Sequence, residues 1–263
     1  MHIIIIINKL FIETNMLFMK LSERERHSTQ LQTYRYVFLL SVITLALAVA
    51  PSTNIVRGDN INPGVYSTQS APYGIPYQQW MAKYWQWDFS IPKAQHPRDN
   101  YTPEKCAYGQ QGPVWFLIES LHIETEERTC TIPAGKSILA AVLTAECDRS
   151  DPTLHNDQEL RICATEGNDV GLGEVSATLD GVPIKNLDQY RTDSGYFNIT
   201  VPADNIFDEP PGTYRAFVNG IFVFLEPLPA GTHDLDLKVI VLNSIKPQYN
   251  YAAEWKYHLI VKP

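Results

Sequence analysis

Residues 231–242 read GTHDLDLKVIVL, and the alternation within them decides the fold class of this chain. Apolar positions alternate with charged ones: Leu235, Leu237 and Val239 against Asp234, Asp236 and Lys238. Successive side chains of a strand point to opposite faces of a sheet, so this pattern predicts a strand with one face in a core and one in water.

The same alternation recurs from about residue 171 to the C-terminus. EVSATLDGVPI (174–184) reads as a hairpin about Asp180-Gly181, and TYRAFVNGIFVFLEP (213–227) as a second hairpin about Asn219-Gly220, because such pairs favour tight hairpin turns. Six or more strands at this spacing predict a mostly-β fold. We expect residues 171–263 to form a β-sandwich part of immunoglobulin-like or jelly-roll-like type.

Upstream, PYQQWMAKYWQWDFSIP (76–92) predicts one aromatic amphipathic helix packed on the sandwich. Pro76 suits the first turn of a helix and Pro92 ends it. Residues 138–145 are continuously apolar, which predicts a strand buried on both faces. A short helix is expected to begin at Asn156, with Glu159 completing a capping box. Residues 76–170 thus read as a helix-plus-β part.

The four cysteines, Cys106, Cys130, Cys147 and Cys163, indicate two disulfides in an exported protein. Of the three possible pairings we favour Cys106–Cys130 with Cys147–Cys163, which closes the shorter loops. A zinc site would need close pairs such as C-x-x-C, which this sequence lacks. We expect neither a metal nor a cofactor.

The N-terminus reads as a secretory signal. An uncharged apolar run at 36–50 follows basic residues and ends in Ala46-Leu47-Ala48, which predicts a signal peptide at 1–48 rather than an uncleaved anchor. Residues 1–15 look like an N-terminal extension outside the true start, and 49–75 like a flexible lead-in. The predicted location is therefore secreted, extracellular or at the cell surface, with no membrane span after cleavage.

The charge balance limits the classes of partner that the protein is expected to bind. The full chain carries 21 basic and 29 acidic residues. Removing residues 1–48 takes away five basic and three acidic residues, which leaves 16 against 26 and a net charge of −10. Nucleic acid is excluded as a partner because phosphate contacts need clustered Lys and Arg, and no basic run exists.

Several stretches resemble, in this order, a family of secreted bacterial and archaeal proteins: YWQWDFSIP, CAYGQQGPVWFL, TCTIPAGK, AEC, GIFVFLEPLPAGTH and YHLIV. The resemblance covers most of residues 80–261 and rests on the aromatic helix, the C-x-x-G-Q-x-G-P-V-W segment and the P-A-G-K turn. It implies export, the disulfides and a single fold across the mature chain. It transfers no catalytic residue.

Aromatic residues supply the first candidate site: Trp80, Trp85, Trp87 and Trp115. Exposed rings at these positions would stack on the C–H face of a sugar, whereas aromatic side chains at helical spacing more often lie in a core. Asp88 falls in the middle of the aromatic arc of the helix. It must be paired, open to water or shifted in pKa, since burying an unpaired carboxylate is costly.

Carboxylates and one histidine supply the second candidate site, with Asp88, Glu146, Asp148 and His233 as catalytic residues. Drawn together, they would serve acid–base hydrolysis of a glycosidic, ester or lactone bond. We favour a non-enzymatic binding protein for an extracellular glycan, small molecule or other envelope component. A secreted hydrolase is the alternative, and a purely structural surface protein a third reading.

Overall fold

The computed structural model describes residues 62, 64–119, 125–169, 172–242 and 251–263, all within the compact unit Asn60–Pro263. The predicted signal peptide and the beginning of the lead-in lie outside these residues. The unit is mostly β, as predicted, with two mixed sheets. The first sheet has the order β1 (Val114–Leu117), β3 (Ser137–Asp148), β7 (Gly212–Leu225), β6 (Arg191–Val201). The second has the order β2 (Glu126–Pro133), β9 (Tyr251–Lys262), β8 (Gly231–Val241), β4 (Leu172–Leu179), β5 (Val182–Pro183).

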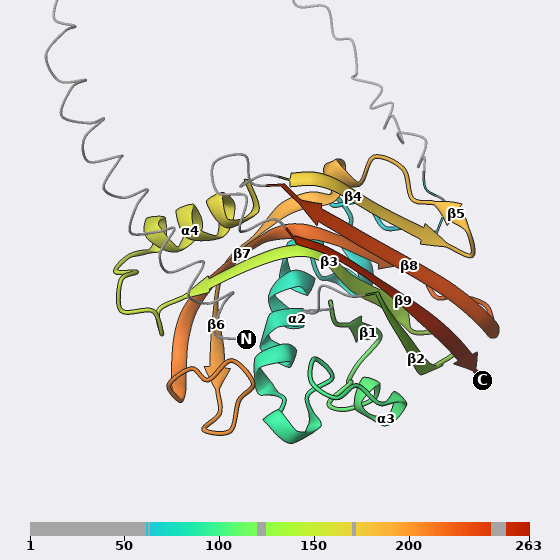
Figure 1. Ribbon diagram of the computed structural model, residues 1–263, viewed down its shortest axis with the longest axis horizontal. Helices are drawn as coiled ribbons and strands as arrows, with labels where there is room; N and C mark the ends of the chain where they lie inside the picture. Colours follow the sequence, from blue (N-terminus) through green and yellow to red (C-terminus); the bar gives the residue numbers. More distant parts are fainter. Residues whose placement is uncertain (1–61, 63, 120–124, 170–171, 243–250) are drawn as a thin grey trace, which may run out of the picture. The chain divides into compact units, whose positions relative to one another are not determined.

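Of the α-helices in the described residues, two cover opposite faces of the first sheet and the third lies beside the second sheet. They are α2 (Tyr77–Ser90), α3 (Pro103–Cys106) and α4 (Asp157–Asp169), with the single turns η1 (Pro72–Gly74), η2 (Lys93–Gln95) and η3 (Leu187–Tyr190). Figure 1 shows α2 crossing one face of the sheet, while α4 lies beyond the other face. The helix expected to begin at Asn156 is α4, which is 13 residues long. The Asn156 side chain caps it by accepting the Glu159 N–H at 3.0 Å.

Alternation along the strands of the first sheet builds two cores. Leu139, Phe222 and Phe224 contact the aromatic face of α2. Their neighbours Ile138 and Val223 point the other way, into the apolar layer between the two sheets. β3 is central in its sheet, and residues 138–143 are buried, as the apolar run predicts. The packing of the two sheets is sandwich-like, with α2 as a third layer on the first sheet.

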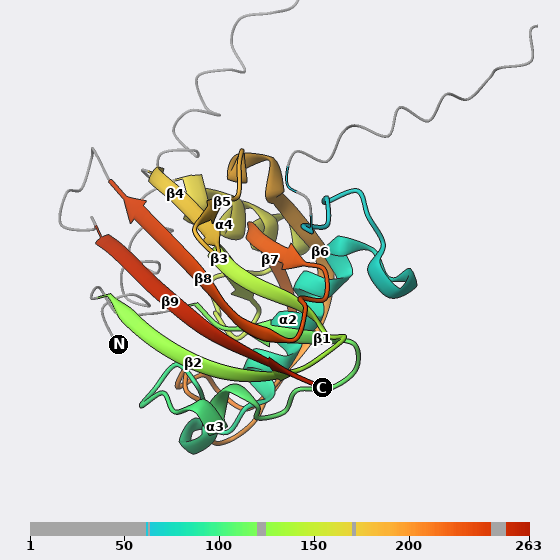
Figure 2. The same cartoon turned by 90° about the vertical axis from the view of Figure 1, so that its right-hand side faces the viewer.

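Strands from both predicted parts of the chain are neighbours in both sheets. β1 and β3 pair with each other and β3 pairs with β7, while β2 pairs with β9 (Figure 2). The sandwich is therefore not confined to residues 171–263, because 76–170 supply β1 and β3 to the first sheet and the edge strand β2 to the second. The end of the lead-in is also ordered on the first sheet, since the Tyr66 N–H donates to the Phe224 carbonyl at 2.8 Å.

The two Asn/Asp-Gly pairs behave differently. Asp180 and Gly181 both have positive φ, at 51° and 73°, and form the predicted hairpin turn between β4 and β5. The predicted hairpin about Asn219-Gly220 is wrong, because β7 runs through both residues without a break. A Cβ at Gly220 would lie 2.7 Å from the Leu143 carbonyl oxygen, just after a bulge in β3. This glycine permits close approach of strands rather than a turn.

The two disulfides have the favoured pairing. Cys106–Cys130 ties α3 to β2, and Cys147–Cys163 ties β3 to α4. The first holds α3 beside the edge strand β2, as Figure 2 shows, and the second holds α4 against the end of β3. Within the described residues, no helix is long and apolar enough to cross a membrane.

Candidate functional site

Asp88 lies inside α2, which continues to Ser90, and its side chain is completely buried. Its Oδ2 accepts a hydrogen bond from the Arg98 guanidinium at 2.7 Å. Although burial alone would raise the pKa of Asp88, Arg98 and then His96 outweigh it, so the pKa lies below its usual value. The carboxylate in the aromatic arc is therefore ionised and paired.

His96 supplies the second contact to Asp88. Its Nε2 lies 3.2 Å from the Asp88 carbonyl oxygen and 3.0 Å from Oδ1. Its Nδ1 accepts the Arg98 main-chain N–H at 3.2 Å, so the neutral ring carries its proton on Nε2. That N–H is directed at the carbonyl oxygen, which makes the contact with Oδ1 chiefly electrostatic. His96 thus fixes the turn that brings Arg98 to Asp88.

Arg98 joins Asp88 to the end of β1. Its guanidinium also donates to Glu119 Oε1 at 3.2 Å, and Glu119 accepts the Thr144 hydroxyl at 2.9 Å. The rings of Trp85 and Phe207 flank it at 5.6 and 5.9 Å. Burial would lower the pKa of Arg98, but the carboxylates raise it instead, so the charge is permanent. The network connects α2, the turn after it, β1 and β3.

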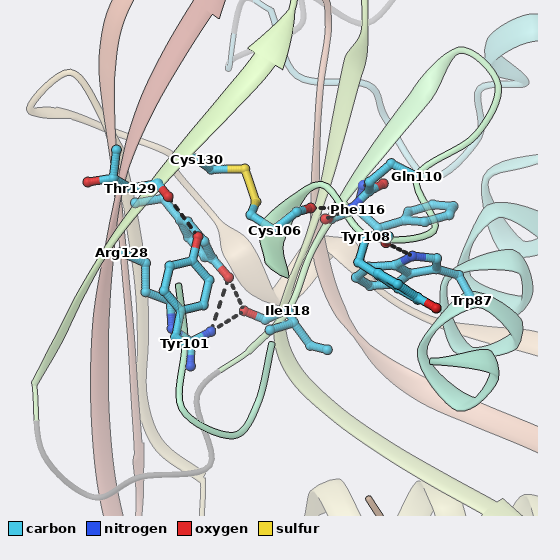
Figure 3. The surroundings of a disulfide bond; sticks show 11 residues. Trp87, Tyr101, Cys106, Tyr108, Gln110, Phe116, Ile118, Arg128, Thr129 and Cys130 are labelled. Carbon is cyan, nitrogen blue, oxygen red and sulfur yellow. Dashed lines mark hydrogen bonds between the residues drawn. A yellow bond between two sulfur atoms is a disulfide. The ribbon is translucent and has the colours of Figure 1, made fainter. Parts of the chain in front are cut away.

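A second buried arginine holds Ile118, the residue that follows β1. The Arg128 guanidinium donates to the Ile118 carbonyl at 3.1 Å, and the Tyr101 and Tyr257 rings lie 5.0 and 5.7 Å from it. Figure 3 shows this bond next to the Cys106–Cys130 disulfide. The sequence reasoning singled out neither arginine. A signal for Arg98 existed, because a carboxylate on an apolar helix face needs a cation and His96-Pro97-Arg98 follows the helix.

The C-x-x-G-Q-x-G-P-V-W segment and the P-A-G-K turn have structural roles. The Gln110 side chain bonds both the N–H and the carbonyl of Phe116, at 2.9 and 2.8 Å. The Trp87 indole donates to the Tyr108 carbonyl at 3.1 Å (Figure 3). Lys136 of the P-A-G-K turn donates to the Gly112 carbonyl, so one motif fastens the other.

The four candidate tryptophans lie in the core, at 5–7% exposure. Trp80, Trp85 and Trp87 pack between α2 and the first sheet, and Trp115 lies in the layer between the sheets. None of these rings offers a free face for stacking on a sugar.

Three of the four candidate catalytic residues face one side of the first sheet. Asp88 and Asp148 both raise the pKa of Glu146 electrostatically, although burial is the larger cause, and that pKa lies well above its usual value. His233 is elsewhere, on β8 of the second sheet, with its Nδ1 2.8 Å from Asp180. Asp88, Glu146 and Asp148 therefore lie on one side of the first sheet, and His233 lies apart from them. No group of His, Cys, Asp or Glu among the described residues is placed to hold a metal ion.

Tyr73 is the most exposed aromatic side chain that the structure describes, at 47%. Its backbone is left-handed, with φ 57° and ψ 27°, and Gly74 follows with φ 74°. A bulky residue in this conformation is a genuine outlier. Its hydroxyl lies 2.9 Å from Ser137 Oγ, and its ring meets Trp80 edge-on at 6.2 Å. The ring is thus held by Ser137 and Trp80, and the rest of it is exposed to solvent.

Comparisons with known proteins add no family. No protein-family model and no curated protein matches this chain. Among solved structures, it is similar to the structure of PbICP-C in complex with falcipain-2, with a TM-score of 0.23 and 11% identity over 57% of this chain and 100% of that one. The solution structure of amebosin matches with a TM-score of 0.17 and 11% identity, over 57% of this chain and 99% of that one. Neither likeness carries an inference about this chain.

Proposed function

We propose that the protein is an extracellular or cell-surface binding protein without catalytic activity, and that its ligand is a carbohydrate or another envelope component. The observation that carries the proposal is Tyr73. A left-handed backbone costs a non-glycine residue about 1–2 kcal/mol, yet this chain places a half-exposed tyrosine there. Strain of this kind clusters at functional sites.

The geometry of Tyr73 suits a sugar. A tyrosine ring gives a flat apolar face with a polar hydroxyl at its edge. Here the hydroxyl is anchored on Ser137 and the ring edge on Trp80, so little side-chain freedom remains to be lost on binding. Lys83, whose Nζ lies 5.9 Å from the Trp80 ring centroid, adds an exposed cation to this surface.

Sedimentation with insoluble polysaccharides, followed by a glycan array, tests the proposal. Tyr73→Ala should abolish binding while the thermal unfolding midpoint stays close to that of wild type. Tyr108→Ala is the matched control, because Tyr108 is another exposed tyrosine, at 40%, and lies near α3 instead. Retention by no glycan, or equal loss in both variants, would contradict the assignment.

A hydrolase is the second candidate, and the opposite pKa shifts of Asp88 and Glu146 favour it. Neighbouring carboxyl groups whose pKa values are pushed apart can act as base and acid. Burial and then Asp148 raise the pKa of Glu146, while Arg98 and His96 hold that of Asp88 down. Chromogenic glycosides and esters provide the test: turnover by wild type that Glu146→Gln removes would support hydrolysis. Absence of turnover on every substrate would reject it.

A further inference from the structure

Glu146 lies near the end of β3, on the same face as the polar residue Thr144. Alternation sets the faces: Ala145 meets Gly167 of α4, and Cys147 is bonded to Cys163 of α4. Glu146, between them, therefore points to the opposite face, where Thr144 contacts Glu119. This is the face that α2 covers.

One oxygen of Glu146 is sealed from water without a donor. The residue as a whole is partly exposed, but its Oε1 is buried and has no hydrogen-bond partner among the described residues. A buried carboxylate oxygen without a donor is costly, whereas a protonated carboxyl group loses that charge and gains a donor of its own.

Among the described residues, the charged groups that act on Glu146 are carboxylates. They come from three elements: Asp148 from β3, Glu209 from the connection between β6 and β7, and Asp88 from α2. The residue opposite on β7 is Val218, which does not titrate. Arg98, the cation of the Asp88 network, is held by Asp88 and Glu119.

Ser150 uses its two donors on the neighbouring carboxylates. Its N–H bonds Asp148 Oδ1 at 2.5 Å, and its hydroxyl bonds Glu209 Oε2 at 2.8 Å. Asp148 and Glu209 are thus tied together by one serine, while Glu146 is left beside them. Protonation of Glu146 would give this cluster the donor that it lacks.

We infer that Glu146 is a proton-binding site built into the fold, and that losing this proton as pH rises loosens the packing of α2 and of the Glu209 connection on β3. Burial, with repulsion from Asp148 and Glu209, raises the pKa of Glu146 well above the usual value for a glutamate. A pKa raised by folding gives stability that is full below about 4.5 and is lost as pH rises through the folded pKa. Within that window, one such group increases the unfolding equilibrium constant up to about tenfold per pH unit.

Urea unfolding of wild type and Glu146→Gln from about pH 5 to about pH 9 measures the effect. The neutral amide keeps the shape and cannot ionise. Wild type should therefore show the steeper rise of the unfolding constant with pH, by up to about tenfold per unit. Glu254→Gln is the matched control, because Glu254 is an exposed carboxylate on β9, and it should follow wild type.

A spectroscopic measurement keeps the inference testable if Glu146→Gln does not fold. Infrared difference spectra of wild type should show the carbonyl band of a protonated carboxyl group that persists above the pH at which exposed glutamates ionise, and raising the pH further should remove it. Absence of such a band, or identical pH slopes for wild type and Glu146→Gln, would overturn the inference. Neither readout depends on binding through Tyr73.

Discussion

Replacing Arg98 with methionine should be among the most damaging single changes outside the apolar core. Arg98 and Asp88 are 1% and 0% exposed, and their atoms approach to 2.7 Å. Removing the cation leaves a buried carboxylate with only the His96 contact. Opposite charges about 4 Å apart interact by about 4 kcal/mol at an effective dielectric constant of about 20. Breaking buried pairs costs about 3–5 kcal/mol.

The double-mutant cycle separates the pair from its surroundings. For a folded unit of this size, about 3–5 kcal/mol lowers the thermal midpoint by about 6–20 °C. Calorimetry and urea unfolding of Arg98→Met, Asp88→Leu and the double variant give the four corners of the cycle. The double variant should recover about 1–3 kcal/mol relative to the sum of the single changes. Trp85 and Phe207 already form an apolar setting for the methionine.

Lys93→Met is the matched control for this cycle. Lys93 pairs with Asp208 at 2.9 Å, but the two side chains are 43% and 49% exposed, so solvent screens the pair and little change is expected. If Arg98→Met were as mild as Lys93→Met, or if the Arg98 and Asp88 changes were simply additive, the claim that this pair stabilises the fold would be wrong. Glu119 loses its contact with Arg98 both in Arg98→Met and in the double variant. The contribution of Glu119 therefore largely cancels from the coupling energy.

Three further outcomes follow from the structure. Gly220→Ala should destabilise by about 1–3 kcal/mol through overpacking, because its Cβ would lie 2.7 Å from the Leu143 carbonyl; an unchanged urea midpoint would contradict this. Replacing Cys106 and Cys130 with serine opens a loop of 24 residues and should cost about 3 kcal/mol, whereas full urea resistance would count against it. Because folding lowers the pKa of Asp88, its contribution is present above its unfolded pKa and is lost as pH falls through its folded one; urea midpoints in acid should show this loss in wild type and not in Asp88→Leu.

Much of the fold could be read from the sequence because strand alternation is a local signal. Leu235 and Leu237 are buried in β8, as their spacing predicts. The two Asn/Asp-Gly pairs show the limit of what a local sequence pattern can predict. Asp180-Gly181 forms a turn, but Gly220 is required by the Leu143 carbonyl across the sheet. Nothing near Gly220 in the sequence identifies that partner.

The polar network around Asp88 could be predicted only in part, for the same reason. The apolar arc of α2 showed that Asp88 needs a partner, and a nearby turn supplied His96 and Arg98. Glu119 completes the network from β1, 31 positions beyond Asp88 in the chain. Its presence depends on how β1 lies beside β3, which alternation within one strand does not specify.

The two buried arginines explain how β1 is fixed despite its four residues. The carbonyls of Ile118 and Glu119, just past the strand, receive Arg128 at 3.1 Å and Arg98 at 3.5 Å respectively. Arg128 belongs to the second sheet, and Arg98 follows the helix that covers the first. Each guanidinium lies within 5.0–5.9 Å of the centroids of two aromatic rings. The aromatic cluster of α2 therefore does two things at once: its rings fill the core, and they help hold the cation that Asp88 requires.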